Sequence, residues 1–215
     1  MKTIRTWMAL AVACSAILAQ AGTVLVSCAG DSITAGVGVA NPGKESYPAQ
    51  LGALLGEGYE VRNFGVGGRT LARKADPYAF SPSLQSNPDI LICLLGTNDT
   101  KAYCAPYRDA FVEEYVTQLN LFQKRNPAVK LLIGIPPTVH TERWGINEPA
   151  AKEIRALVRE VAEKVGAELI DFEVLLRDKP ECFADGIHPN AKGYRVMAER
   201  AAEAVRGISG TGEAK

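Results

Sequence analysis

Histidine is scarce in this sequence, because His140 and His188 are the only two among 215 residues. A metal site takes three or four protein ligands, and histidine and cysteine are the commonest of them. Neither an HxxxH nor a CxxC spacing occurs. The sequence therefore predicts no metal centre, and no motif in it indicates an organic cofactor.

An excess of charge of one sign is also missing, since 24 lysines and arginines balance 24 aspartates and glutamates. The sequence contains no basic tract, no acidic tail and no alternation of basic with aromatic residues. Proteins that bind nucleic acid or anionic membranes usually carry such clusters. We therefore expect neither nucleic acid nor a membrane surface as a partner, and no feature indicates an oligomeric state.

No hydrophobic run is long enough to span a bilayer, and the most apolar one, "WMALAVACSAILA", lies near the N-terminus. Lys2 and Arg5 precede this run, and "AQA" follows it as an A-x-A cleavage site. Residues 1–21 are therefore predicted to be a signal peptide of a periplasmic or secreted protein. The alternatives are a buried N-terminal helix and a lipoprotein cleaved before Cys14, where Ala11 replaces the larger aliphatic residue usual at that position.

Internal repeats and low-complexity linkers are absent, so we expect one domain over residues 22–206 and a disordered tail over 207–215. Short apolar runs alternate with segments of helical period, which predicts a parallel sheet covered by helices on both faces. The expected strands are 23–28, 59–64, 89–95, 129–135 and 167–172. The expected helices begin near Ser46, cover 112–122, follow Asn147 and Pro149, and follow Asn190 as a cap.

Four segments with unusual polar or glycine residues follow expected strands, where ligands of open parallel sheets bind. "GDSI" offers the Ser32 hydroxyl and backbone N–H, "GVGG" offers the N–H groups of clustered glycines, and "GTND" offers the Asn98 amide as a donor to an oxyanion. Each segment alone is an ordinary turn sequence and a weak signal of function. Their order along the chain is more specific than any one of them.

The fourth segment, "DGIHP", contains His188 three positions after Asp185. His188 can be interpreted as a metal ligand, a buried structural histidine or a base. Gly186 and Pro189 favour a turn, in which Asp185 accepts a hydrogen bond from one ring nitrogen and leaves the other as a base for Ser32.

Together these four segments resemble the SGNH (GDSL) hydrolase family over most of the chain. The resemblance implies a flavodoxin-like three-layer αβα fold with a five-stranded parallel sheet. It also implies a catalytic triad of Ser32, His188 and Asp185, and an oxyanion hole of Ser32, Gly68 and Asn98. Gly68 is preferred to its neighbour Gly67 by counting from Asn63.

The segments "EVRNFGVGGRTL", "LGTNDTK" and "RWGIN" also resemble a subgroup that includes bacterial sialate O-acetylesterases and related carbohydrate esterases. This narrower resemblance implies a glycan ester substrate, and the few residues left for a lid favour a small acyl group. Arg69 is a candidate ligand for a substrate carboxylate or a member of a salt bridge. Trp144 is a candidate stacking surface for a sugar or a core residue anchoring its loop. A lysophospholipase or thioesterase, and a non-catalytic glycan-binding module, remain as alternatives.

Four cysteines follow the predicted signal peptide. Cys28 and Cys93 lie in apolar strand-like runs and are expected to be buried thiols. Cys104 and Cys182 lie in loop-like segments beside the motifs, and an exported protein meets oxidising conditions. We therefore predict a disulfide between Cys104 and Cys182.

Overall fold

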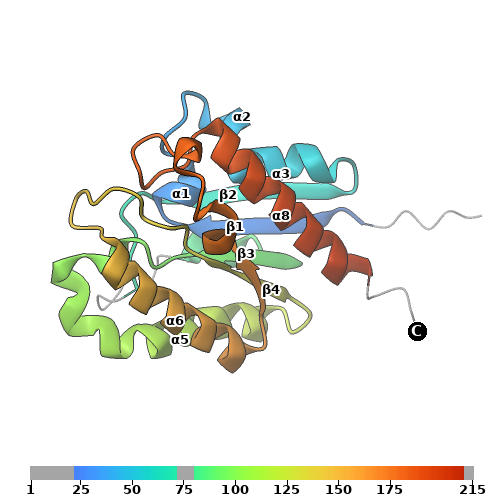
Figure 1. The fold of residues 1–215 in the computed structure, drawn as a ribbon. Helices are drawn as coiled ribbons and strands as arrows, with labels where there is room; N and C mark the ends of the chain where they lie inside the picture. Colours follow the sequence, from blue (N-terminus) through green and yellow to red (C-terminus); the bar gives the residue numbers. More distant parts are fainter. Residues whose placement is uncertain (1–21, 72–79, 211–215) are drawn as a thin grey trace, which may run out of the picture.

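The computed structural model describes residues 22–71 and 80–210 and shows a single parallel sheet between two layers of helices (Figure 1). The strands lie in the order β2-β1-β3-β4-β5, and all neighbouring pairs are parallel. Their bounds are β1 Val24–Gly30, β2 Tyr59–Gly65, β3 Ile90–Leu94, β4 Lys130–Ile135 and β5 Glu168–Asp171. All five expected strands are confirmed within two residues.

The sheet is buried on both faces because side chains alternate along each strand. In β3, Ile92 packs into the core beneath α3 (Tyr47–Leu55) and α8 (Ala191–Gly210), whereas Leu91 and Cys93 pack beneath α5 (Phe111–Arg125) and α6 (Glu148–Val165). Figure 1 shows these helix pairs on opposite sides of the sheet. The predicted three-layer αβα fold is therefore confirmed.

Short helical segments connect the main elements, and most of them follow the carboxyl end of a strand. They are α1 Ser32–Ala35, α2 Pro42–Glu45, α4 Ser81–Gln85, η1 Asn98–Thr100, η2 Ala102–Ala110, α7 Phe172–Leu176 and η3 Pro180–Cys182. Several of them contain or adjoin the polar motifs of the sequence. The carboxyl edge of the sheet is therefore the place where a functional site is expected.

The caps expected at Asn147 and Asn190 are present, and Ser46, near which a helix was expected to begin, is also a cap. The Ser46 hydroxyl accepts a hydrogen bond from the Ala49 N–H at the start of α3, and the Asn147 side chain accepts one from Ala150 in α6. Asn190 accepts hydrogen bonds from the backbone of the first turn of α8. Each side-chain oxygen satisfies an N–H group that a helix leaves unpaired at its start.

The C-terminal helix is longer than expected, because α8 continues to Gly210. Ile208 lies three positions after Val205 and continues its buried stripe, with only 8% of its surface exposed. The Ser209 hydroxyl donates to the Val205 carbonyl. Residues 207–210 are therefore helical, so the prediction of a disordered tail is wrong for these residues. The rest of that tail and the predicted signal peptide over 1–21 lie outside the described residues.

The expected disulfide between Cys104 and Cys182 is not formed in the described structure. Cys104 belongs to the core beneath α5 and α6, whereas Cys182 belongs to the core beneath α3 and α8. The sheet separates these two cores, so the thiols cannot approach to bonding distance. Cys28 and Cys93 are buried thiols, as predicted.

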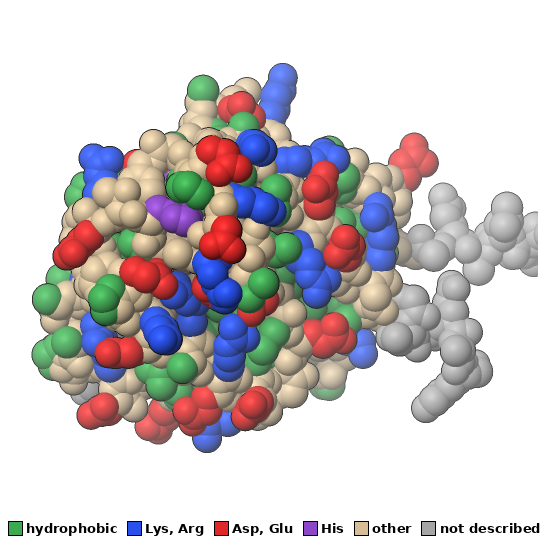
Figure 2. Space-filling view, in the orientation of Figure 1, with side chains coloured by type: hydrophobic (Ala, Val, Ile, Leu, Met, Phe, Trp, Pro, Cys, Tyr) green, Lys and Arg blue, Asp and Glu red, His purple; other side chains and the backbone are tan. Residues whose placement is uncertain are grey.

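Acidic and basic side chains are interspersed over the face that carries α6 and α8, as Figure 2 shows. Among the helices of the described ranges, none combines the length and the apolar character that crossing a membrane requires.

Candidate active site

Ser32 is held in a tight turn between β1 and α1. Asp31 caps α1, and its Oδ1 accepts a hydrogen bond of 2.9 Å from the Ile33 N–H. A Cβ at Gly30 would overlap the Thr34 side chain and the Leu94 carbonyl, so the turn can pack this closely only with glycine there. The turn leaves Ser32 9% exposed at the carboxyl edge of the sheet.

His188 connects Ser32 to a carboxylate. Its Nε2 lies 2.9 Å from Ser32 Oγ, and its Nδ1 lies 2.8 Å from Asp185 Oδ2. The three side chains form a continuous chain of hydrogen bonds, although 156 positions separate Ser32 from His188. The structure therefore brings together all three residues of the predicted triad.

The turn that contains Asp185 and His188 is fixed by backbone hydrogen bonds. Asp185 Oδ1 accepts from the N–H groups of Ile187 and His188 at 2.9 and 2.8 Å. Gly186 has φ of +85°, and a Cβ there would overlap Thr141, so this turn requires glycine. Burial opposes ionisation of Asp185, but the hydrogen bonds from the His188 backbone and ring and from Ile187 outweigh it and lower the pKa of the carboxyl.

Two further donors lie beside Ser32. Asn98 begins η1 and is 3% exposed, and Gly68 has φ of +78° with open space where a Cβ would be. Both line the same cavity as Ser32, as the sequence predicts. Gly67 does not line the cavity, although a Cβ there would lie 4.0 Å from Ser32 Cβ.

Asp31 links the serine turn to Asn98. While its Oδ1 caps α1, its Oδ2 lies 3.4 Å from the Asn98 amide nitrogen, which donates to it. Burial raises the pKa of Asp31 to about 7, and the nearby Asp99 carboxylate adds to the shift. The sequence motif contained Asp31, but only the structure shows that it contacts the side chain of Asn98, in the segment that follows β3.

The cavity over these groups has a volume of about 440 Å³. Its lining residues are Ser32, Val37, Gly68, Asn98, Lys101, Trp144, Ile146 and His188. Val37 is held in place by the Tyr194 hydroxyl, which donates to its carbonyl at 2.6 Å. Val37, Lys101 and Ile146 were not expected from the sequence, because a hydrophobic or basic residue in a loop carries no specific signal.

Trp144 forms one wall of the cavity from the tip of a small hairpin. Arg143 and Ile146 exchange backbone hydrogen bonds, and the two tip residues Trp144 and Gly145 have φ of +51° and +76°. The turn leaves the indole 57% exposed, with its centroid 5.6 Å from the ring of His188. Trp144 is therefore not the core anchor that the sequence left open as an alternative.

Arg69 does not line the cavity. Its guanidinium donates to the carbonyls of Gly30 and Phe64, at 3.4 and 3.2 Å, and lies 5.9 Å from the ring centroid of Phe80. These contacts connect β1, β2 and Phe80, the residue before α4. The position of Arg69 therefore supports a structural role and does not support the expected contact with a substrate carboxylate.

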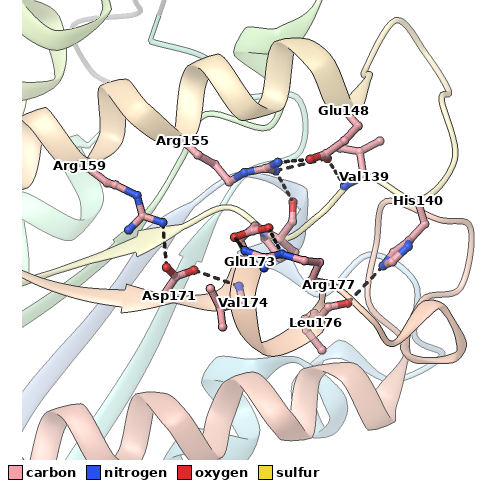
Figure 3. A network of polar contacts seen from close by, with 11 residues as sticks. Val139, His140, Glu148, Arg155, Arg159, Asp171, Glu173, Val174, Leu176 and Arg177 are labelled. Carbon is pink, nitrogen blue, oxygen red and sulfur yellow. Dashed lines mark hydrogen bonds and ion pairs between the residues drawn. The ribbon is translucent and has the colours of Figure 1, made fainter.

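A second hollow of about 520 Å³ lies between α6 and α7 and is lined mainly by charged side chains (Figure 3). Its guanidinium groups are already paired with carboxylates. The pairs are Arg155 with Glu148, Arg159 with Asp171, and Arg177 with Glu173. The hydrogen bond from Arg177 lowers the pKa of Glu173.

This network supports the segment that carries Trp144. Glu148 Oε2 accepts from the Val139 N–H at 2.8 Å, and Arg155 donates to the Pro137 carbonyl at 3.3 Å. The His140 Nε2 lies 3.2 Å from the Leu176 carbonyl oxygen. Figure 3 draws this contact, and the backbone N–H of His140 donates to the Gly186 carbonyl. We therefore interpret the charged side chains around the second hollow as structural, because they hold this segment in place. No group of three or more His, Cys, Asp or Glu side chains in residues 22–71 and 80–210 is placed to hold a metal ion.

The structure combines a parallel sheet with a hydrogen-bonded serine, histidine and aspartate at its carboxyl edge. This combination is typical of hydrolases that use a serine nucleophile. The chain belongs to the GDSL-like Lipase/Acylhydrolase family, whose sequence model matches residues 28–196. That range contains all four motifs of the sequence. The resemblance to SGNH (GDSL) hydrolases is therefore confirmed.

Individual relatives are carbohydrate and aryl esterases. An acetylxylan esterase of Xylanibacter ruminicola is 35% identical over 207 residues, which cover 85% of this chain and 43% of the relative. The chain therefore spans less than half the length of that relative. Among solved structures, a proposed arylesterase of Agrobacterium tumefaciens C58 is 25% identical with a TM-score of 0.72, covering 86% of this chain and 99% of that one. Est24, a carbohydrate acetylesterase of Sinorhizobium meliloti, is 24% identical with a TM-score of 0.68 and the same coverage, and it shares the fold.

Proposed function

We propose that this protein is a serine esterase that removes acetyl groups from carbohydrates. The observation that carries the proposal is the continuous chain of hydrogen bonds from Asp185 through His188 to Ser32, which ends in an open cavity. A serine hydroxyl is a weak nucleophile unless a positioned base removes its proton. The geometry around Ser32 supplies that base.

In the proposed reaction, Ser32 Oγ attacks the ester carbonyl while His188 Nε2 takes its proton. Asp185 holds the imidazole in the tautomer that presents a free Nε2, and it stabilises the imidazolium that forms. As the bond between the acyl carbon and the sugar oxygen breaks, His188 gives the proton to that oxygen, and the sugar leaves with a free hydroxyl. Water, again with His188 as base, hydrolyses the acetyl-serine and regenerates the free enzyme.

The oxyanion of the tetrahedral intermediate would be stabilised by the backbone N–H groups of Ser32 and Gly68 and by the Asn98 amide. The Asn98 amide has two N–H donors, of which one is directed at Asp31. The other remains for the oxyanion. A single donor of this kind commonly contributes about 2.7 to 4 kcal/mol to transition-state stabilisation.

Two features support an acetylated sugar as the substrate. The 35% identical relative is an acetylxylan esterase, and the exposed Trp144 indole offers a flat apolar surface of the kind on which sugar rings stack. Within this class we include acetylated sialic acids, as the motif subgroup suggests. We also propose that residues 1–21 export the enzyme, because acetylated polymers occur outside the cell.

The acyl-chain preference tests this function. On p-nitrophenyl esters, kcat/KM is expected to fall steeply beyond acetate or butyrate, because the cavity of about 440 Å³ must hold the alcohol as well as the acyl group. Acetate release from acetylated xylan, mucin and sialic acids then identifies the sugar. The Ser32→Ala protein serves as the control for both measurements.

A different outcome would identify another function. Activity that rises with acyl-chain length indicates a lysophospholipase or thioesterase of the same fold. Binding of the glycans with no ester hydrolysis by the wild type indicates a glycan-binding module. Either result contradicts the acetylesterase proposal.

A further inference from the structure

Lys101 is the charged side chain that belongs to the cavity wall without taking part in the hydrogen bonds of Ser32. It follows η1, and its N–H donates to the Asn98 carbonyl at 3.2 Å. Its stem lies beneath the hairpin tip, since a Cβ at Gly145 would lie 3.8 and 4.0 Å from Lys101 Cγ and Cβ. Lys101 is therefore held between the Asn98 turn and the Trp144 wall.

Lys101 is half-buried, and within the described ranges its ammonium group has neither an ion pair nor a hydrogen bond. The two carboxylates of the neighbouring motifs are engaged elsewhere. Asp31 accepts from Ile33 and Asn98, Asp99 accepts from the Leu71 N–H at 2.7 Å, and both are fully buried. Lys101 interacts electrostatically with Asp31 but forms no ion pair with it, so its ammonium group remains able to make a charge-assisted hydrogen bond to an anionic ligand.

The surroundings of Lys101 indicate which anion fits. Val37, Trp144 and Ile146 give the cavity apolar walls, which suit the ring of a sugar. The Arg143 guanidinium stacks 4.7 Å from the Trp144 ring centroid and adds positive charge at the rim, next to the exposed Glu142. Arg69, in contrast, is directed at backbone carbonyls behind the cavity.

We propose that the cavity selects acetylated sugars that carry a carboxylate, and that Lys101 binds this carboxylate. This inference rests on the esterase function proposed above and narrows its substrate class to acidic sugars. Asn98 and Lys101 lie in one turn and line one cavity, so we assign the acetyl group at the oxyanion donors and the carboxylate at Lys101 to the same sugar. A uronic acid and a sialic acid are the two sources of such a carboxylate.

The test compares acids with neutral isosteres. The substrates are an O-acetylated methyl glucuronoside and O-acetylated N-acetylneuraminic acid, each beside its carboxamide, which has the same shape and no charge. We expect the wild type to prefer at least one acid over its carboxamide by about tenfold in kcat/KM, the effect of one charge-assisted hydrogen bond. Lys101→Met should reduce that ratio to about one, mainly through KM. Lys152→Met, at an exposed lysine of the second hollow, should keep the ratio.

Binding to the Ser32→Ala protein, measured by calorimetry, separates this inference from the esterase function. If the wild type releases no acetate but the Ser32→Ala protein still binds an acid more tightly than its carboxamide, the esterase proposal fails and the carboxylate site stands. The inference is overturned if neither acid is preferred, or if Lys101→Met keeps the preference. It is also overturned if Lys101→Met slows the acid and the carboxamide equally, because Lys101 then acts on the oxyanion of any ester.

Discussion

Replacing His188 with alanine is expected to lower kcat/KM for p-nitrophenyl acetate by about 10⁵- to 10⁶-fold. His188 Nε2 lies 2.9 Å from Ser32 Oγ and is the only base in hydrogen-bonding contact with that oxygen among the described residues. Without it the hydroxyl keeps its proton, and the remaining rate comes from the oxyanion donors and from binding. The measurement is steady-state hydrolysis by purified wild type and variant.

His140 provides a matched control, because it is the other histidine of the chain. Its ring contacts the Leu176 carbonyl and the Phe183 ring and does not line the cavity. We expect His140→Ala to keep turnover within a few-fold of wild type, with thermal denaturation checking that both variants fold. Equal losses in the two variants would contradict the role of His188 as base.

Replacing Asp185 with asparagine is expected to lower kcat by about 10⁴-fold while leaving the turn intact. The asparagine oxygen can take the place of Oδ1 and still accept from the N–H groups of Ile187 and His188. Its NH₂ group then faces His188 Nδ1 and donates to it, so the ring proton moves to Nε2. That tautomer cannot accept the proton of Ser32. A variant with more than a tenth of wild-type kcat would contradict this role.

The same substitution tests the lowered pKa of Asp185. Because the folded-state pKa lies below the unfolded value of about 3.9, the ionised carboxyl stabilises the fold above that pH. The contribution is lost as the pH falls through the folded-state pKa. The difference in unfolding free energy between wild type and Asp185→Asn should therefore shrink as the pH decreases below about 4. A difference independent of pH would contradict the shift.

The layers of the fold could be predicted because local patterns and tertiary packing agree. The run Ile90–Leu94 is buried on both faces and reads as a central parallel strand, and Asn147 followed by Pro149 begins a helix in both sequence and structure. The predicted end of the last helix was wrong, because the buried apolar stripe of this helix continues past Gly207. Ile208 belongs to the stripe of α8, although the domain was expected to end at residue 206.

The candidate site could be predicted where chain topology alone decides proximity. Ser32 and Asn98 follow neighbouring strands, so they meet at one edge, and a short turn before α8 brings His188 to them. Side-chain direction and the face of the sheet do not follow from topology. Arg69 turns toward backbone carbonyls, and Cys104 and Cys182 lie on opposite faces. The sequence did not indicate Lys101 as a site residue. Lys101 lines the cavity because the hairpin that contains Trp144, which is distant in sequence, packs against it.

Covalent labelling of Ser32 tests the proposed nucleophile most directly. After treatment with a fluorophosphonate, the wild type is expected to gain the mass of one phosphonyl group, located by peptide mass spectrometry on the peptide that contains Ser32. The Ser32→Ala protein should gain none, and His188→Ala should react far more slowly. Labelling of a different residue, or an unlabelled protein that still hydrolyses p-nitrophenyl acetate, would contradict the proposed serine mechanism.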